Sequence, residues 1–129
     1  MRHMAIIPKE ELMNAAAVAG NGGTAVSEIV DLRRYLGVGS ILAVLDGTTP
    51  SISLKISVAN NPNDTFRTAY DSNGNDISDI VAAGSEITAT RWIQFDPVLA
   101  KYMKITATGS AANSADATCS LELVMQEAL

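Results

Sequence analysis

Aromatic residues, cysteine and histidine are all scarce in this chain of 129 residues, which has six aromatic residues, one cysteine and one histidine. Because Cys119 is alone, a disulfide within the chain and a cysteine-based zinc site are excluded. The one histidine is His3, so a catalytic Ser-His or Cys-His pair is not expected. These absences predict a protein that is not an enzyme, with no cofactor and no metal.

Basic charge and long hydrophobic runs are also lacking. Nine Lys and Arg residues stand against 14 Asp and Glu residues, which gives a net charge of −5 and a pI near 4.6. Phosphate binding needs clustered basic side chains, and here they are scattered, so no nucleic-acid partner is expected. The longest apolar runs, such as residues 41–45, are far shorter than the roughly 20 residues that span a bilayer. No membrane partner is expected either.

Small residues make up much of what is present. Apolar residues account for 47% of the chain, but 19 of its residues are alanines, and serine and threonine add 21 more. This mixture favours strands with small side chains over a pocket lined by aromatic rings. The length fits one domain, since single domains commonly have about 100–150 residues.

Turn residues recur at short intervals along the chain. Glycine, asparagine, aspartate and proline cluster at residues 20–23, 37–39, 46–50, 60–64, 71–76, 84, 96–97 and 109–113. Short apolar or alternating runs lie between these clusters, a spacing that is typical of all-β sandwiches and barrels. No repeat and no linker divides the chain into two domains.

The runs between the turns alternate as half-buried strands do. Residues 52–58 place Ile, Leu, Ile and Val on one face, and residues 101–108 and 117–125 follow the same pattern. Residues 39–46 are apolar on both faces, as in a central strand. Weaker candidates are residues 25–32, 66–70, 77–82 and 86–95. The sequence therefore predicts an all-β, antiparallel, jelly-roll-like sandwich of about eight or nine strands over residues 20–129.

The segment before that sandwich is ambiguous. Pro8, Glu10 and Glu11 resemble the start of a helix, and three alanines follow. The alternation of residues 12–18 also permits a strand. We favour a short helix or irregular lead, forming an N-terminal arm over residues 1–19 that docks on a neighbouring subunit.

Residues 71–79 carry oxygen-bearing side chains at alternate positions, as a calcium loop begins. The pattern then fails, because Asp76 and Ala82 stand where an EF-hand loop has glycine and an acid. Asn73-Gly74 is a preferred pair for a tight turn between two strands. A plain hairpin tip is therefore the favoured interpretation, with calcium binding left open.

The aromatic residues are the other candidates for binding. Trp92, Tyr102 and Tyr70 would serve as stacking platforms for sugar rings if they were exposed, although Trp92 is equally suited to a core or a subunit interface. Outward-facing threonines would give a flat, uncharged surface for packing against another copy; these are Thr88, Thr90, Thr106 and Thr108.

The order of these segments resembles a known group of proteins. Ile29–Tyr35 leads into the buried run Ile41–Leu45, then Gly47–Ser51 introduces the alternating run Ile52–Val58. Ala100–Gly109 and Ala117–Val124 close the pattern. This layout, over residues 12–126, is similar to the small β-sandwich auxiliary or decoration proteins of tailed-phage and prophage virions. Discoidin-like and other carbohydrate-binding sandwiches share the Lys101-Tyr102 type of strand.

The resemblance implies a structural, non-enzymatic protein that stabilises the phage head. Its partners would be the major capsid protein and other copies of itself, with a homotrimer expected from the local three-fold points of capsid lattices. It would be made in the bacterial cytoplasm and located on the virion. The alternative is a carbohydrate-binding module for attachment to a host surface. Candidate partner-binding residues are Leu12, Met13 and Val18 in the arm and Trp92 and Tyr102 in the sandwich.

Overall fold

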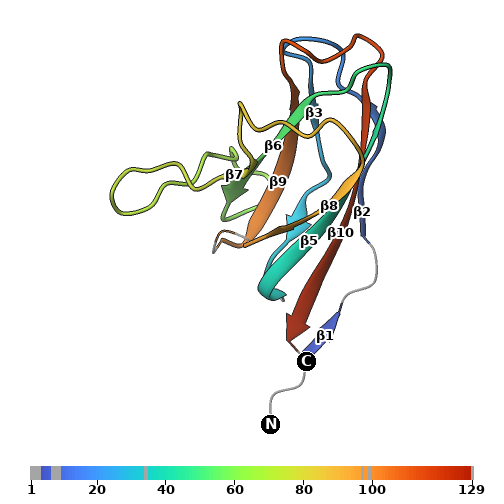
Figure 1. Cartoon of the computed structure of the whole chain (residues 1–129). Helices are drawn as coiled ribbons and strands as arrows, with labels where there is room; N and C mark the ends of the chain where they lie inside the picture. Colours follow the sequence, from blue (N-terminus) through green and yellow to red (C-terminus); the bar gives the residue numbers. More distant parts are fainter. Residues whose placement is uncertain (1–3, 7–9, 34, 97, 99, 129) are drawn as a thin grey trace.

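The structure, a computed structural model, describes residues 4–6, 10–33, 35–96, 98 and 100–128. This part of the chain is all-β: it forms ten strands and no helix. Two antiparallel sheets face each other, and the loop of residues 60–78 projects from the side of the sandwich (Figure 1).

The first sheet has the order β2-β10-β5-β8, and β1 continues along the β2 side of β10. Its strands are β1 (Met4–Ile6), β2 (Glu10–Ala17), β10 (Thr118–Ala128), β5 (Tyr35–Asp46) and β8 (Arg91–Phe95). The second sheet has the order β3-β9-β6-β7, with β4 also paired to β9. Its strands are β3 (Thr24–Val26), β4 (Val30–Asp31), β9 (Tyr102–Gly109), β6 (Ile52–Ala59) and β7 (Asp79–Val81).

This strand order is that of a jelly roll. The chain passes from β2 to the second sheet, returns for β5, leaves for β6 and β7, and then alternates through β8, β9 and β10. Because β1 and β2 share one neighbour and β3 and β4 share another, ten strands fill eight positions. The jelly-roll-like β-sandwich expected from the sequence is confirmed.

The hydrophobic core lies between the two sheets and follows the alternation of the strands. Every second residue of β6 from Ile52 to Ile56 and of β9 from Met103 to Ala107 is buried. The first sheet contributes alternate residues of β5 from Ile41 to Leu45 and of β10 from Cys119 to Met125. The strands predicted over residues 39–46, 52–58, 101–108 and 117–125 are therefore confirmed, and β5 is central as expected.

The N-terminal helix or projecting arm expected over residues 1–19 is wrong for residues 10–19. Glu10–Ala17 is β2, which pairs with β10 from Thr118 to Leu123. Two register shifts bulge β2, and Ala15 adopts a φ of 44° within it. The bulges break the alternation, so that the consecutive residues Leu12 and Met13 are both buried. Burial against β10 outweighs the local helix signals.

The weaker strand candidates were partly correct. Residues 25–32 form the two short strands β3 and β4, residues 77–82 contain β7, and residues 86–95 contain β8. Residues 66–70 were wrongly predicted as a strand: Arg67 and Tyr70 make isolated bridges to Val58 and Asp76 inside the projecting loop. That loop turns away from the sheet, so no continuous ladder forms.

One end of the sandwich is closed around Asn113, which is 7% exposed. Its Nδ2 donates to the carbonyl oxygens of Val18, at 2.6 Å, and Gly20, at 2.9 Å, and its Oδ1 accepts from the Ser51 amide at 3.0 Å. A Cβ at Gly109 would overlap the Gly20 carbonyl oxygen and this side chain. Asn113 therefore ties three chain segments together in a space without room for more atoms.

Cys119 lies fully buried on the inner face of β10, and this burial raises the pKa of its thiol to about 12. We expect a thiol reagent to modify Cys119 at least about a hundredfold more slowly in the native protein than in denaturant, because reaction requires opening of the core. Absorbance at the reagent's product band measures both rates. The control is Ala111→Cys in a Cys119→Ser background, which places a thiol in an exposed turn and should react at once. Equally fast native labelling of Cys119 would contradict the expectation.

Candidate interaction surface

Within the described residues, no group of three or more His, Cys, Asp or Glu side chains could hold a metal ion. The search of the same residues also finds no helix long and apolar enough to cross a membrane. The carboxyl group with the largest shift has a structural cause: hydrogen bonds from the Thr48 amide and hydroxyl and from Ser114 hold the pKa of Asp116 at about 2. This carboxylate fastens two loops at one end of the sandwich.

The polar loop of residues 71–79 folds as a hairpin tip. Asp71 Oδ1 accepts hydrogen bonds from the amides of Asn73 and Asn75, both at 2.9 Å, which lowers the pKa of the Asp71 carboxyl. Gly74 has a φ of 81°, as a tight turn requires. Asp76 instead binds Lys55 Nζ of β6 at 2.6 Å. The oxygens that resembled a calcium loop thus serve the loop's own backbone and its attachment to the second sheet.

Three of the five candidate partner-binding residues lie in the core. Leu12 is 2% exposed, Met13 6% and Val18 0%. Their apolar character, which suggested a docking arm, instead reflects the inner side of β2 and the turn after it. They form no part of an exposed surface.

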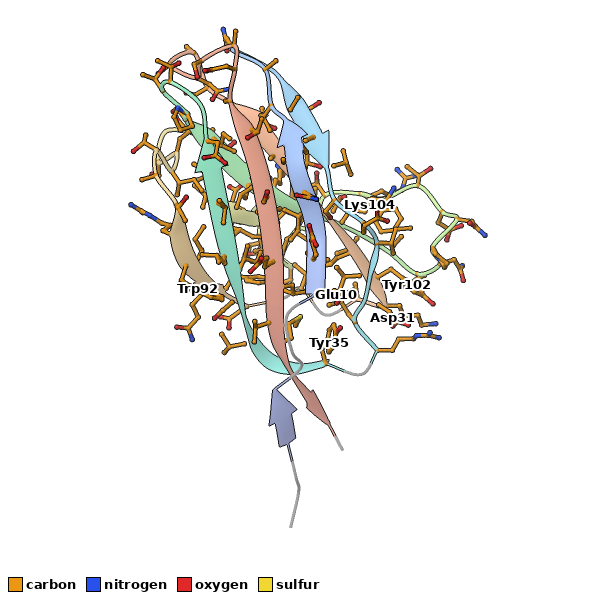
Figure 2. The ribbon with its side chains drawn as sticks, turned by 90° about the vertical axis from the view of Figure 1, so that its right-hand side faces the viewer. Glu10, Asp31, Tyr35, Trp92, Tyr102 and Lys104 are labelled. Carbon is orange, nitrogen blue, oxygen red and sulfur yellow. The ribbon has the colours of Figure 1, made fainter. Side chains whose placement is uncertain are left out.

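The other two candidates lie on opposite faces of the sandwich (Figure 2). Trp92 is on β8 of the first sheet and is 58% exposed. Tyr102 is on β9 of the second sheet, is half-buried, and lies 5.3 Å below the guanidinium of Arg33. Tyr70 is exposed in the projecting loop. The three rings therefore do not form one stacking platform.

The outer face of the first sheet around Trp92 is apolar. Trp92 is the cross-strand neighbour of Leu42 on β5, and Val44 and Val38 point to the same side of β5. Val124 extends this surface onto β10, and Glu122 is the charged residue between them. We call this surface, made of Val38, Leu42, Val44, Trp92 and Val124, the β5 face. No described segment of the chain covers it.

Sequence reasoning missed Leu42 and Val44, although the signal was present. Residues 41–45 were recognised as apolar on both faces and therefore as central in the sheet. In the structure one of those faces packs in the core, and the other is half-exposed. A strand that is apolar on both sides in an antiparallel sheet with one open face indicates a surface that is covered in an assembly.

The predicted threonine surface is split by the fold. Thr106 and Thr108 are on the outer face of the second sheet, whereas Thr88 and Thr90 precede β8, where Thr90 Oγ1 accepts a hydrogen bond from the Leu45 amide at 3.1 Å. Lys55 and Lys104 lie among the outward residues of the second sheet, and Lys104 Nζ lies 4.4 Å from the Phe66 ring centre. This face is polar and positively charged rather than uncharged.

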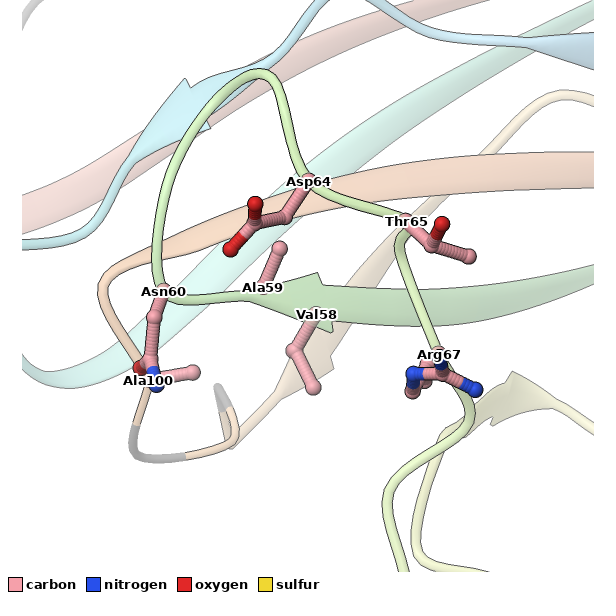
Figure 3. Close-up of a pocket in the computed structure, with 7 residues that line it drawn as sticks. All are labelled: Val58, Ala59, Asn60, Asp64, Thr65, Arg67 and Ala100. Carbon is pink, nitrogen blue, oxygen red and sulfur yellow. The ribbon is translucent and has the colours of Figure 1, made fainter.

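Two concave regions are open to solvent. The first, of about 320 Å³, lies where the projecting loop leaves β6 and contains Asp64 and Arg67 beside Asn60 (Figure 3). The second, of about 380 Å³, runs between the edge strands β7 and β8. Its apolar lining is Ile80, Val81, Ile87, Trp92 and Ile93. We call the second region the edge groove; it adjoins the β5 face at Trp92.

No protein-family model matches this chain, and no curated protein matches it significantly. Among solved structures, a protein of Bacillus endospore appendages, described as disulfide-linked pili, is similar over 100% of this chain and 91% of its own length, at 12% identity and a TM-score of 0.52. Infectious bursal disease virus Gx strain matches 98% of this chain with 32% of its own, at 12% identity and a TM-score of 0.47. A family 35 carbohydrate-binding module from Clostridium thermocellum matches 93% of this chain with 90% of its own, at 16% identity and a TM-score of 0.41. At these identities the similarity concerns the fold alone: the chain is a β-sandwich of an architecture found in structural and in binding proteins.

Proposed function

We propose that this chain is a structural protein of a repeating assembly, and specifically a decoration protein that stabilises the head of a tailed phage or prophage virion. The observation that carries the proposal is the β5 face, whose apolar residues Leu42, Val44 and Trp92 are left uncovered by the rest of the chain. Contiguous exposed apolar patches of this kind mark interaction sites.

The mechanism would be avidity. One such face offers limited area, but a capsid presents the same binding position many times, so that weak contacts repeated by symmetry stabilise the shell. The major capsid protein would be the partner at the β5 face, in place of the anchoring arm expected from the sequence. The protein would be made in the bacterial cytoplasm and located on the capsid surface.

Assembly would be non-covalent. The similar appendage protein is described as part of disulfide-linked pili, but Cys119 here is 0% exposed and is the chain's single cysteine. A disulfide between copies would require the core to open. Cohesion in the assembly therefore depends on surfaces such as the β5 face.

Co-sedimentation with capsids lacking this protein, from the phage or prophage that encodes it, tests the proposal. We expect Leu42→Lys to lower binding at least about tenfold, because a lysine in the centre of the β5 face must be desolvated on docking. The matched control is Val26→Lys on the second sheet, where Val26 is 57% exposed. Equal binding by parent and Leu42→Lys, with both folded by circular dichroism, would contradict capsid binding through this face.

The second candidate is carbohydrate binding, favoured by one observation: Arg91 and Gln94 provide hydrogen-bonding groups beside Trp92 in the edge groove. Trp92 is the single tryptophan, so its fluorescence reports directly on that site. We expect no spectral shift with mono- and oligosaccharides at millimolar concentration, because one ring without a second platform gives little affinity. A saturable shift that Trp92→Phe abolishes would favour the carbohydrate-binding function over the structural one.

A further inference from the structure

Open sheet edges are hazards that natural proteins protect, because their unpaired N–H and C=O groups are templates for another strand. Three of the four edge positions in this sandwich are protected. At the first, β2 carries two bulges and begins with Glu10 and Glu11. At the second, β3 and β4 have three and two residues, with residues 27–29 between them. At the third, β7 has three residues, a register shift and the acidic residue Asp79.

The fourth edge, β8, has none of these protections. Its five residues pair with β5 in unbroken register, from Gly39↔Phe95 to Ala43↔Arg91, and it contains no proline, lysine or bulge. Within the described residues β5 is its one partner strand. Trp92, 58% exposed, stands on this edge strand instead of a charged residue.

The edge groove continues the apolar surface past β8 toward the second sheet. Ile80, Val81 and Ile87 line its far side, and Trp92 and Ile93 line the near side. A strand added to β8 would therefore extend the backbone ladder and cover apolar side chains in the groove. An unprotected edge beside an apolar groove fits a polypeptide partner.

The charges at the two ends of β8 point to which polypeptide it is. Arg91 begins the strand and Asp96 follows its last residue, and both are exposed. No ion pair involves either of them in the part of the chain that the structure describes. If two copies of β8 run antiparallel, the Arg91 end of each meets the Asp96 end of the other. The edge is thus complementary to itself.

We propose that β8 pairs with β8 of a second copy across a two-fold axis near Ile93, joining the first sheets of two molecules into one continuous sheet. In this register Trp92 faces Gln94 of the second copy on the outer surface, and each copy covers part of the other's edge groove. Such a contact is isologous and closes as a dimer. It names the self-contact of the assembly proposed above, but it is testable in solution without capsids. The trimer expected from the sequence would need a different contact.

Light scattering coupled to size-exclusion chromatography, over a series of protein concentrations, tests the pairing. We expect the parent protein to reach the mass of two copies. Arg91→Asp and Asp96→Arg should each weaken the dimer at least about tenfold, because each places like charges together at both ends of the pair. The double variant Arg91→Asp/Asp96→Arg should recover dimerisation, a result that loss of folding in the single variants cannot produce.

Trp92→Lys supplies an independent measurement, since a lysine on an edge strand disfavours pairing. We expect it to be monomeric where the parent is dimeric, and we expect Val26→Lys to dimerise as the parent does. The parent's Trp92 fluorescence should shift to the blue as dimers form. A parent that is monomeric at every concentration or has the mass of a trimer, or charge variants that fail to show the rescue, would overturn the proposal. Capsid binding by a monomer would overturn it while leaving the decoration function intact.

Discussion

Removal of residues 1–19 is expected to unfold the protein rather than to release a stable sandwich that lacks an arm. The deletion takes away β2, an edge of the first sheet, with the core residues Leu12, Met13 and Val18. Burial of a large aliphatic or methionine side chain contributes about 1.5–3 kcal/mol, so the three together contribute about 5–9 kcal/mol. The whole stability of a domain is about 5–15 kcal/mol. Circular dichroism and thermal denaturation of the truncated chain measure the loss.

Point substitutions separate the strand from an arm without deleting backbone. Leu12→Ala should lower the free energy of unfolding by about 2–5 kcal/mol, as for other fully buried leucines. The matched control is Asn14→Ala on the exposed side of β2, which should stay within about 0.5 kcal/mol of the parent. If Leu12→Ala were as stable as Asn14→Ala in urea, the N-terminal segment would not belong to the core.

The predictable part of this fold is the part in which local pattern and burial agree. β6 and β9 alternate without interruption in the sequence and in the structure, so their strands, faces and approximate ends were correct. β10 behaves in the same way from Cys119 to Met125. In a sandwich with each sheet's inner face packed on the other, period-two alternation is sufficient to assign both the strand and its buried side.

The part that sequence did not predict depends on contacts between distant segments. Bulges in β2 arise from its pairing with β10, more than 100 residues away, and they bury Leu12 and Met13 in succession. The separation of Trp92 from Tyr102 follows from their strands belonging to different sheets, which alternation cannot reveal. For the β5 face, the sequence supplied the apolar residues but not which side of the strand stays uncovered.

Asn113 is a second residue whose role is set by distant contacts, and its substitution is expected to have the other large effect. In the sequence it stands in a polar turn like many others, whereas in the structure it joins the segments that hold Val18, Gly20 and Ser51. Asn113→Ala leaves two carbonyl oxygens and one amide without this partner at a buried position. Each such group costs about 1–3 kcal/mol when unsatisfied, and partial hydration reduces the sum. We expect the free energy of unfolding to fall by about 2–4 kcal/mol in urea titrations.

Two further variants distinguish the hydrogen bonds of Asn113 from its volume. Asn113→Asp keeps the shape but directs a carboxylate at the carbonyl oxygens of Val18 and Gly20, so at neutral pH it should be at least as unstable as Asn113→Ala. Those carbonyls favour the protonated acid, which raises the pKa of the new carboxyl in the folded state. Its stability relative to the parent should therefore recover as the pH falls below that pKa, since the protonated acid again donates a hydrogen bond. Asn21→Ala, in the adjacent exposed turn, is the control and should change stability by less than about 0.5 kcal/mol. An Asn113→Asp variant as stable as the parent at neutral pH would mean that Asn113 fills space at this end of the sandwich without its amide holding the loops together.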